Sequence, residues 1–404
     1  MKKINTIVPF DSPVSLRDSI YLCLKDEIYY MLRDKKLPAK RNEKKSELAE
    51  RLYEAMNDKR TIERYFLIIS EIEEEALKQS LTTKDGHFSG QEAFPVLETA
   101  GYVYWDLKEE VYFVPKEVQD FYRKISKSVG FKTRHHQMQW LFACITTACM
   151  LYVITPVEVL NQLIIQDKSC HIKEEDIIPL LQSMPPDVTN LKFSPPLIMS
   201  DNVSNNMKEI LALQANKPFY IPTYSEIIEG PSMWIMETDA GYAFEDFLID
   251  NLDIDEEDAW NITLNIGLMI MSDAPIPIII SQIVQNQIIP DEKEVDTFFS
   301  LLADFNNNTR RIINRGFTSK EIAEIAERDN CKDIISGIWE NKNKPKAKNK
   351  KKNYKNEIDT TKLPQAYFLK NTSPEKEKEE PEKNKESKAN VIALSEYKKR
   401  KKIY

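Results

Sequence analysis

Residues 24–56, LKDEIYYMLRDKKLPAKRNEKKSELAERLYEAM, carry the clearest structural signal in the chain. Apolar residues recur at helical spacing in the first part of this stretch, and the helical run ends at Asp34. The chain then turns through Lys35–Pro38, and a second amphipathic run starts near Ser46. This second run brings Leu48, Leu52 and Tyr53 onto one face. The stretch predicts two short helices joined by an extended turn.

This pattern resembles the SAP and Rho N-terminal group of domains. The match lies in residues 24–56 and depends most on Lys45–Leu52, KSELAERL, a lysine followed by the EL-x-x-RL helix of these domains. The resemblance implies a two-helix module over residues 15–60 that contacts the nucleic-acid backbone through its turn and second-helix start. Seven cations cluster there: Arg33, Lys35, Lys36, Lys40, Arg41, Lys44 and Lys45. A solvated loop would have the same composition, so both interpretations stay open.

Charge is strongly segregated along the chain. Residues 341–404 hold 20 Lys and Arg against 9 Asp and Glu, a net charge of +11, and the rest of the chain carries −19. No Lys or Arg occurs between Lys217 and Lys293. A basic tail on an acidic body could fold back on that body, or it could contact nucleic acid or another acidic surface. A solubilising, disordered tail would have the same composition. The acidic section in turn would suit a basic protein partner. Residues 398–402, Lys398, Lys399, Arg400, Lys401 and Lys402, form a bare cationic patch.

The composition argues against several classes of protein. Only 9 glycines occur, and neither G-x-x-x-x-G-K-[ST] nor G-x-G-x-x-G is present, so the common nucleotide cradles have no support. Five widely spaced cysteines and an amino terminus without an apolar h-region predict a reduced, cytoplasmic protein. The longest apolar run, residues 138–154, is interrupted by polar residues and too short for a bilayer span, which predicts no membrane partner.

Residues 61–130 are predicted to form a helical, winged-helix-like domain. Residues 62–81 read as one helix, and residues 94–97 as a short one. Residues 101–105 and 111–114 flank an acidic turn, which suits a β-hairpin in the position of a wing. Pro115 then opens a helix over residues 116–125. The acidic turn favours a structural or protein-binding role for the hairpin over contact with phosphate.

The remaining chain divides by composition. Residues 131–184 are expected to be helical with breaks at Pro156 and Pro179, residues 185–220 to be a proline-containing connection, and residues 221–340 to be an acidic helical domain. Asp255–Asp258 are expected to be the first turn of the helix that contains Trp260. Residues 341–404 are predicted to be a disordered basic tail with two apolar islands, residues 363–369 and 391–397, as docking motifs.

Residues 306–322, NNNTRRIINRGFTSKEI, carry a second resemblance. They are similar to an N-T-R-x-x-x-N-x-G-x-T-x-x-E-[LI] segment found in uncharacterised helical proteins of Firmicutes, which implies a bacterial protein. The part from Gly316 onward also looks like the entry to a helix of a helix-turn-helix. Thr318 or Ser319 is a good N-cap, and Glu321 is the capping-box partner of Thr318. The acidic residues that follow favour packing over insertion into a DNA groove.

Catalytic and metal sites have little support. His135 and His136 with Cys144 and Cys149, or Cys170 with His171, lack the spacing of known ligand motifs, so core cysteines and surface histidines are favoured. No G-x-S-x-G or other nucleophile motif occurs. No cofactor, metal or catalytic residue is therefore assigned.

The sequence as a whole predicts a mainly α, multi-domain protein. The leading hypothesis for its function is a non-enzymatic nucleic-acid-associated protein that binds DNA or RNA backbone through basic patches without strong sequence readout. The alternative is a protein-interaction adaptor with an acidic helical surface and tail docking motifs. An enzyme is a third option, because missing motifs do not exclude a new helical active site.

Overall fold

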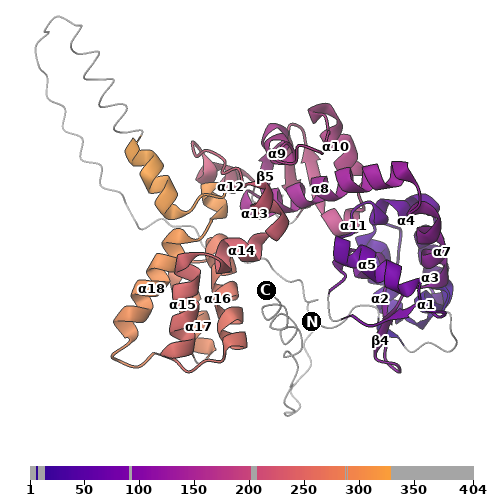
Figure 1. The fold of residues 1–404 in the computed structure, drawn as a ribbon, viewed down its shortest axis with the longest axis horizontal. Coiled ribbons are helices and arrows are strands. Elements are labelled where there is room, and N and C mark those ends of the chain that lie inside the picture. The colour runs from indigo at the N-terminus through magenta and orange to yellow at the C-terminus, as the bar shows by residue number, and fades with distance from the viewer. Residues whose placement is uncertain are drawn as a thin grey trace, which may run out of the picture. The chain divides into compact units, whose positions relative to one another are not determined.

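The computed structural model describes residues 6–7, 14–90, 93–201, 207–286, 288 and 290–328 (Figure 1). Their structure is mainly helical with two small sheets, which confirms the predicted fold class. The described residues form two compact units. The first holds the described residues up to Cys149 and those from Ile154 to Asp201, and the second holds Met150–Val153 and the described residues from Met207 to Arg328. The predicted basic tail, residues 341–404, lies outside the described residues.

Three helices begin the first unit: α1 (Leu16–Leu22), α2 (Lys25–Asp34) and α3 (Lys45–Met56). α2 and α3 match the two predicted helices. α1 packs on α3 and is a third helix, which was not predicted. The Ser15 side chain caps α1 by accepting from the backbone N–H of Asp18. Ile20, Ile28 and Leu52 are among the fully buried side chains that join the three helices.

The single helix expected over residues 62–81 is wrong, because the chain forms α4 (Lys59–Phe66) and α5 (Glu71–Ser80) with a break between them. Ser70 explains the break. Its side chain accepts from the backbone N–H of Glu73, and the Glu73 carboxylate accepts from the backbone N–H of Ser70. This capping box starts a new helix at a point where the apolar periodicity alone continues.

The predicted hairpin is confirmed. β3 (Tyr104–Asp106) and β4 (Val111–Phe113) pair antiparallel, with Trp105 opposite Tyr112. β1 (Thr6–Ile7) joins β3 in parallel and β2 (His87–Phe88) joins β4 antiparallel, so the sheet has the order β1-β3-β4-β2. α6 (Pro95–Ala100) ends at Gly101, which has φ +77°, before the hairpin, and α7 (Lys116–Ile125) follows it.

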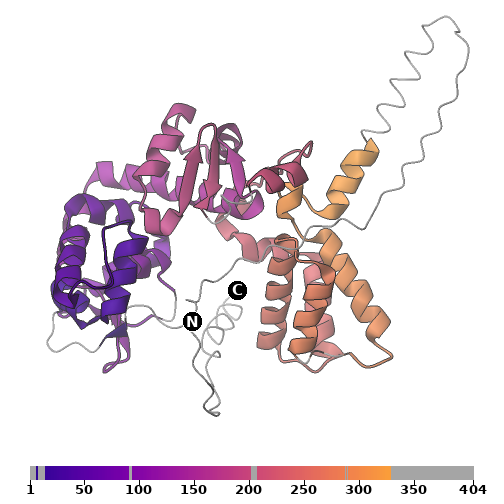
Figure 2. The ribbon, with the colours of Figure 1, turned by 180° about the vertical axis from the view of Figure 1, so that it is seen from behind.

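The rest of the first unit surrounds a second sheet. α8 (Val129–Leu151) leads into β5 (Ile154–Pro156), followed by α9 (Val157–Ile164), α10 (Glu174–Ser183) and α11 (Pro186–Thr189). β6 (Leu191–Ser194) and β7 (Leu197–Ser200) complete the order β5-β7-β6, and the sheet is visible in Figure 2.

Two expectations for this region need correction. Pro179 lies inside α10 and does not end it, although an interior proline removes a backbone donor and its ring crowds the carbonyl four residues earlier. The predicted connection over residues 185–220 contains the β6–β7 hairpin and α12 (Met207–Gln214). Four of its five prolines instead occupy the start of α11 and the turn between β6 and β7, two positions that need no backbone donor from them.

The second unit is helical in its described part. After α12 come α13 (Tyr224–Glu229), α14 (Pro231–Met236), α15 (Asp239–Asp250), α16 (Glu256–Met271), α17 (Ile276–Gln285) and α18 (Val295–Asn308). α15, α16, α17 and α18 lie side by side in Figure 1. A 3-10 turn, Ile312–Asn314, and a helix over residues 319–328 follow. Asp255 caps α16, and Phe244 stacks on Phe305 in the buried core.

Candidate nucleic-acid interface

Lys35, one of the seven predicted contacts, is buried. Its ammonium lies 2.6 Å from Asp187 Oδ2 and also donates to the hydroxyl of Tyr65 and to the carbonyl of Thr99. Only 6% of its side chain is exposed. Lys35 therefore cannot contact a nucleic acid in this structure, and its role is to hold the turn after α2 against the rest of the first unit.

Arg33 and Arg41 gather instead on a pair of tyrosines in α2. The Arg41 guanidinium lies 5.5 Å from the ring centre of Tyr29 and 5.9 Å from that of Tyr30, and it donates to the Tyr30 hydroxyl at 3.0 Å. Arg33 lies 6.0 Å from the Tyr29 ring centre and donates to its hydroxyl, which lowers the pKa of Tyr29. Tyr30 as a residue is 43% exposed. An exposed ring beside guanidinium groups can stack on a base while the cations face phosphate.

Two lysines tie neighbouring segments to this site. Lys25 donates to the backbone carbonyl of Arg41 at 2.8 Å, and Lys45 donates to that of Tyr21 at 2.7 Å. These hydrogen bonds link the end of α1, the start of α2, the loop after α2 and the start of α3. We call the resulting surface the basic aromatic edge, defined by Tyr21, Lys25, Tyr30, Arg33, Lys40, Arg41, Lys44 and Lys45.

The other predicted cations differ in their surroundings. Lys36 pairs with Asp201 at 3.5 Å, while Lys40 and Lys44 are exposed. Glu43, between them in sequence, pairs with Arg51, and this hydrogen bond lowers the pKa of Glu43. Glu43, the carboxylate nearest in sequence to Lys40 and Lys44, is thus neutralised by Arg51 of α3. Lys398, Lys399, Arg400, Lys401 and Lys402 lie outside the described residues.

Tyr21, Lys25 and Tyr30 were not among the predicted contacts. The adjacent residues Tyr29 and Tyr30 could have indicated an exposed ring, because neighbouring residues on a helix point about 100° apart and only one of the two can face the core. Tyr29 is buried and Tyr30 is exposed, as that geometry requires.

Three side chains of the types found in catalytic triads lie together among the described residues but do not form a triad. Ser169, His136 and Asp167 meet at the end of α9, but His136 Nε2 faces both the Ser169 hydroxyl at 2.9 Å and Asp167 Oδ2 at 3.1 Å. The Ser169 hydroxyl is itself a donor to Asp167. A catalytic triad needs the two histidine nitrogens on different partners, so this cluster is a surface hydrogen-bond network. Burial raises the pKa of Cys23 to about 12, that of Cys149 to about 12 and that of Cys170 to about 11.

Metal binding and membrane insertion have no support in the described part of the chain. It contains no group of three or more His, Cys, Asp or Glu side chains placed to hold a metal ion. None of its helices combines the length and apolar character needed to span a bilayer.

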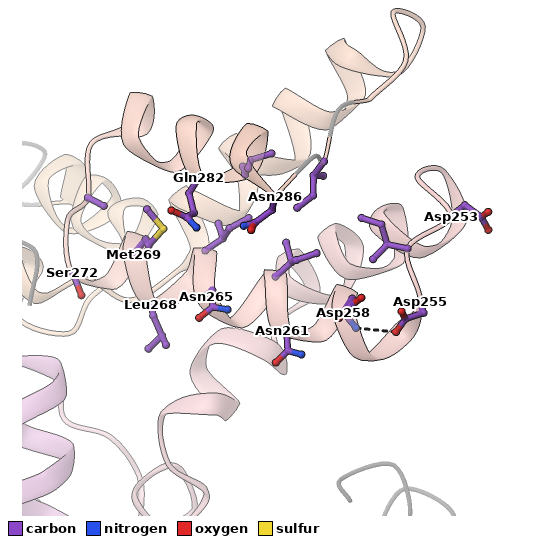
Figure 3. A pocket seen from close by; sticks show the side chains of 16 residues that line it. Asp253, Asp255, Asp258, Asn261, Asn265, Leu268, Met269, Ser272, Gln282 and Asn286 are labelled. Atoms are coloured by element: carbon purple, nitrogen blue, oxygen red, sulfur yellow. Dashed lines mark hydrogen bonds between the residues drawn. The ribbon is translucent and has the colours of Figure 1, made fainter. Parts of the chain in front are cut away.

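The second unit carries two hollows with acidic side chains. One, of about 630 Å³, surrounds Arg310, whose guanidinium lies 3.4 Å from the ring centre of Tyr220 and pairs with Glu226 and Glu321. Its other carboxylates are Glu229, Glu237, Asp239, Asp304 and Glu324. The second, of about 850 Å³, is a groove between α16 and α17 (Figure 3).

The comparisons with known proteins add no family. No protein-family model matches the chain, and no curated protein or solved structure matches it.

Proposed function

We propose that this protein is a non-enzymatic nucleic-acid-associated protein that grips the phosphate backbone of DNA or RNA through the basic aromatic edge. The observation that carries the proposal is the convergence of Arg33 and Arg41 on the rings of Tyr29 and Tyr30, with Tyr30 exposed. The resemblance of residues 24–56 to SAP and Rho N-terminal domains supports it. We place the protein in the cytoplasm of a bacterium.

Affinity for a nucleic acid and specificity for its sequence come from different contacts. Cations at fixed positions displace counterions from the nucleic-acid backbone, and each phosphate contact adds about 0.9 to the salt slope on duplex DNA. Donors that reach base edges are needed for sequence readout. On the basic aromatic edge, Lys25 and Lys45 are held by backbone carbonyls and Arg41 by a tyrosine hydroxyl. This arrangement favours backbone and stacking contacts over base-edge contacts.

The test is fluorescence anisotropy of labelled duplex DNA, single-stranded DNA and RNA over a salt series. The edge variant carries Lys40→Gln, Arg41→Gln and Lys44→Gln, and it should lose most binding and flatten the duplex salt slope by roughly 3. The matched control carries Lys108→Gln, Arg123→Gln and Lys173→Gln, three exposed cations that pair with exposed carboxylates. This control has the same net charge and should bind as the unchanged chain does.

A third variant changes residues 398–402 to glutamine and separates the tail from the edge. Binding lost with this variant and kept with the edge variant would overturn the assignment of the edge. Equal losses of binding in the edge variant and its control would show that binding depends only on the net charge of the protein. No binding by the unchanged chain at low salt would overturn the proposal altogether.

A second candidate function is a protein-interaction adaptor. The observation in its favour is the hollow around Arg310, where five carboxylates besides the two paired with Arg310 line one site. A lysine-rich peptide is the matching partner chemistry. Titration calorimetry with such a peptide should show binding that Glu237→Gln with Asp239→Asn weakens, and no heat of binding would remove this candidate.

A further inference from the structure

The groove between α16 and α17 has an apolar floor. Five isoleucines line it: Ile254 before α16, Ile262 and Ile266 from α16, Ile283 from α17, and Ile288 after α17. At about 850 Å³ the groove is large enough for several residues of a peptide. Its floor is a surface on which apolar side chains would lose contact with water.

The rim of the groove is made of carboxamides. Asn261 and Asn265 come from α16, and Gln282 and Asn286 come from α17 (Figure 3). None of the four side-chain amides hydrogen bonds to another residue in the part of the chain that the structure describes. Each offers both a donor and an acceptor. An extended peptide presents alternating N–H and C=O groups along its length, so this rim fits a backbone.

The two ends of the groove differ in charge. Figure 3 shows Asp253, Asp255 and Asp258 at one end and Ser272 at the other. Asp255 and Asp258 lie close together, and burial together with Asp255 raises the pKa of Asp258. Since no Lys or Arg occurs between Lys217 and Lys293, the helices that form the groove supply no cation to this end.

We propose that this groove binds residues 391–402 of the same chain in an extended conformation. Ile392 and Leu394 alternate along an extended backbone and would both face the floor. The cations at 398–402 follow directly and would meet Asp253, Asp255 and Asp258. The order of the segment, apolar residues and then positive charge, matches the order along the groove. This inference goes beyond the proposed function and does not depend on it.

Lengths and sequence support this occupant. Residues 391–397 span roughly 23 Å when extended, and α16 rises roughly 21 Å from Asp258 to Ser272. The chain between Arg328 and Val391 has a fully extended reach of roughly 200 Å, so its length does not prevent the contact. The other apolar island, residues 363–369, is followed by a single lysine and lacks the cationic run.

Zero-length carbodiimide cross-linking of the full chain tests the proposal, because it joins a lysine to a carboxylate that it touches. Mass spectrometry should find Lys398–Lys402 joined chiefly to Asp253, Asp255 and Asp258. A mixture of light and heavy isotope-labelled protein shows whether the two ends belong to one molecule. Cross-links spread over carboxylates in proportion to their exposure, or formed only between molecules, would overturn the proposal.

Matched variants keep the test specific. Ile392→Asp with Leu394→Asp alters only the segment and should lower the cross-link yield by roughly tenfold or more, because it removes two buried apolar side chains. Tyr367→Asp with Leu369→Asp in the other island should leave the yield unchanged. On the groove side, Asn286→Lys should lower it, while the adjacent Gln285→Lys, outside the groove, should not. Equal effects within either pair would overturn the assignment.

Discussion

Lys35 and Asp187 are 152 residues apart in sequence and form a buried ion pair in the first unit, with Nζ and Oδ2 2.6 Å apart. Their side chains are 6% and 1% exposed. Asp187 also accepts from the hydroxyl of Tyr65, and burial lowers the pKa of Lys35. The pair connects the turn after α2 with α11, at the cost of removing two charges from water.

Replacement of Lys35 by methionine should strongly destabilise the first unit. The carboxylate of Asp187 would stay buried without a cation, which costs about 3–5 kcal/mol in the free energy of unfolding. The double variant Lys35→Met with Asp187→Leu should recover most of this loss. Lys36→Met is the control, since its pair with Asp201 is exposed and contributes about 0–1 kcal/mol. Urea unfolding measures all three, and similar losses for Lys35 and Lys36 would contradict the prediction.

Glu73 should make the stability of the first unit depend on pH. Its Oε1 accepts from the backbone N–H groups of Val96 and Leu97, its Oε2 accepts from that of Ser70, and burial raises its pKa above the usual 4.5. The folded protein therefore holds a proton on Glu73 that the unfolded chain releases. The stability that this proton contributes is fully present below pH 4.5 and is lost as the pH rises through the folded pKa.

The variant Glu73→Gln removes this titration. It should cost about 1–3 kcal/mol at low pH, because an amide N–H₂ would face the backbone N–H of Ser70. Its difference in unfolding free energy from the unchanged chain should narrow as the pH rises above 4.5. Urea unfolding over a pH series measures this difference in unfolding free energy. A difference that widens as the pH rises would contradict the prediction.

Gly267 should resist substitution by alanine although it lies within α16. An added Cβ would lie 2.1 Å from Ile235 Cγ2 and 3.2 Å from the Phe305 ring. Alanine gains about 1 kcal/mol over glycine in a helix, while overpacking costs about 1–3 kcal/mol, so a net loss of up to about 2 kcal/mol is expected. In a protein that already carries Ile235→Ala, Gly267→Ala should cause no further loss of stability, because the side chain that the new Cβ would meet is gone.

The control for Gly267 is Gly130→Ala in α8. There the nearest atom to an added Cβ is Ser128 Oγ at 3.8 Å, so only the helix-propensity gain remains. This variant should be neutral or slightly more stable in thermal unfolding. A stable Gly267→Ala protein would show that α14 shifts easily away from α16.

Local signals in the sequence were enough to predict several elements. α7 follows Pro115 as expected, the expected hairpin forms, and α16 begins with the expected acidic turn, with Asp255 as its cap. In each case the deciding residues are within a few positions of the element. The split between α4 and α5 depended on Ser70, a cap that the longer apolar periodicity concealed.

Long-range pairings were beyond this reasoning. The ion pair between Lys35 and Asp187 removes one of the seven predicted nucleic-acid contacts, and nothing near Lys35 in sequence indicates it. The strand β7 pairs with both β5 and β6, so the prolines around it belong to a sheet. In the candidate interface, the cluster of cations could be predicted from the sequence. The positions of Arg41 and Lys25 near Tyr30 could not, because they depend on how the loop after α2 folds back.

Tyr30 provides the sharpest test of the basic aromatic edge. If it stacks on a base, Tyr30→Ala should weaken single-stranded DNA binding by about 5- to 150-fold, which corresponds to about 1–3 kcal/mol per stacked base. Tyr30→Phe keeps the ring and loses only the hydrogen bond from Arg41, so it should bind almost as tightly as the unchanged chain. Tyr242→Ala removes a tyrosine of equal exposure, 43%, from the second unit and should change nothing. Fluorescence anisotropy at one fixed salt concentration compares the three, and equal affinities for Tyr30→Ala and Tyr242→Ala would leave the edge with cations alone and no stacking platform.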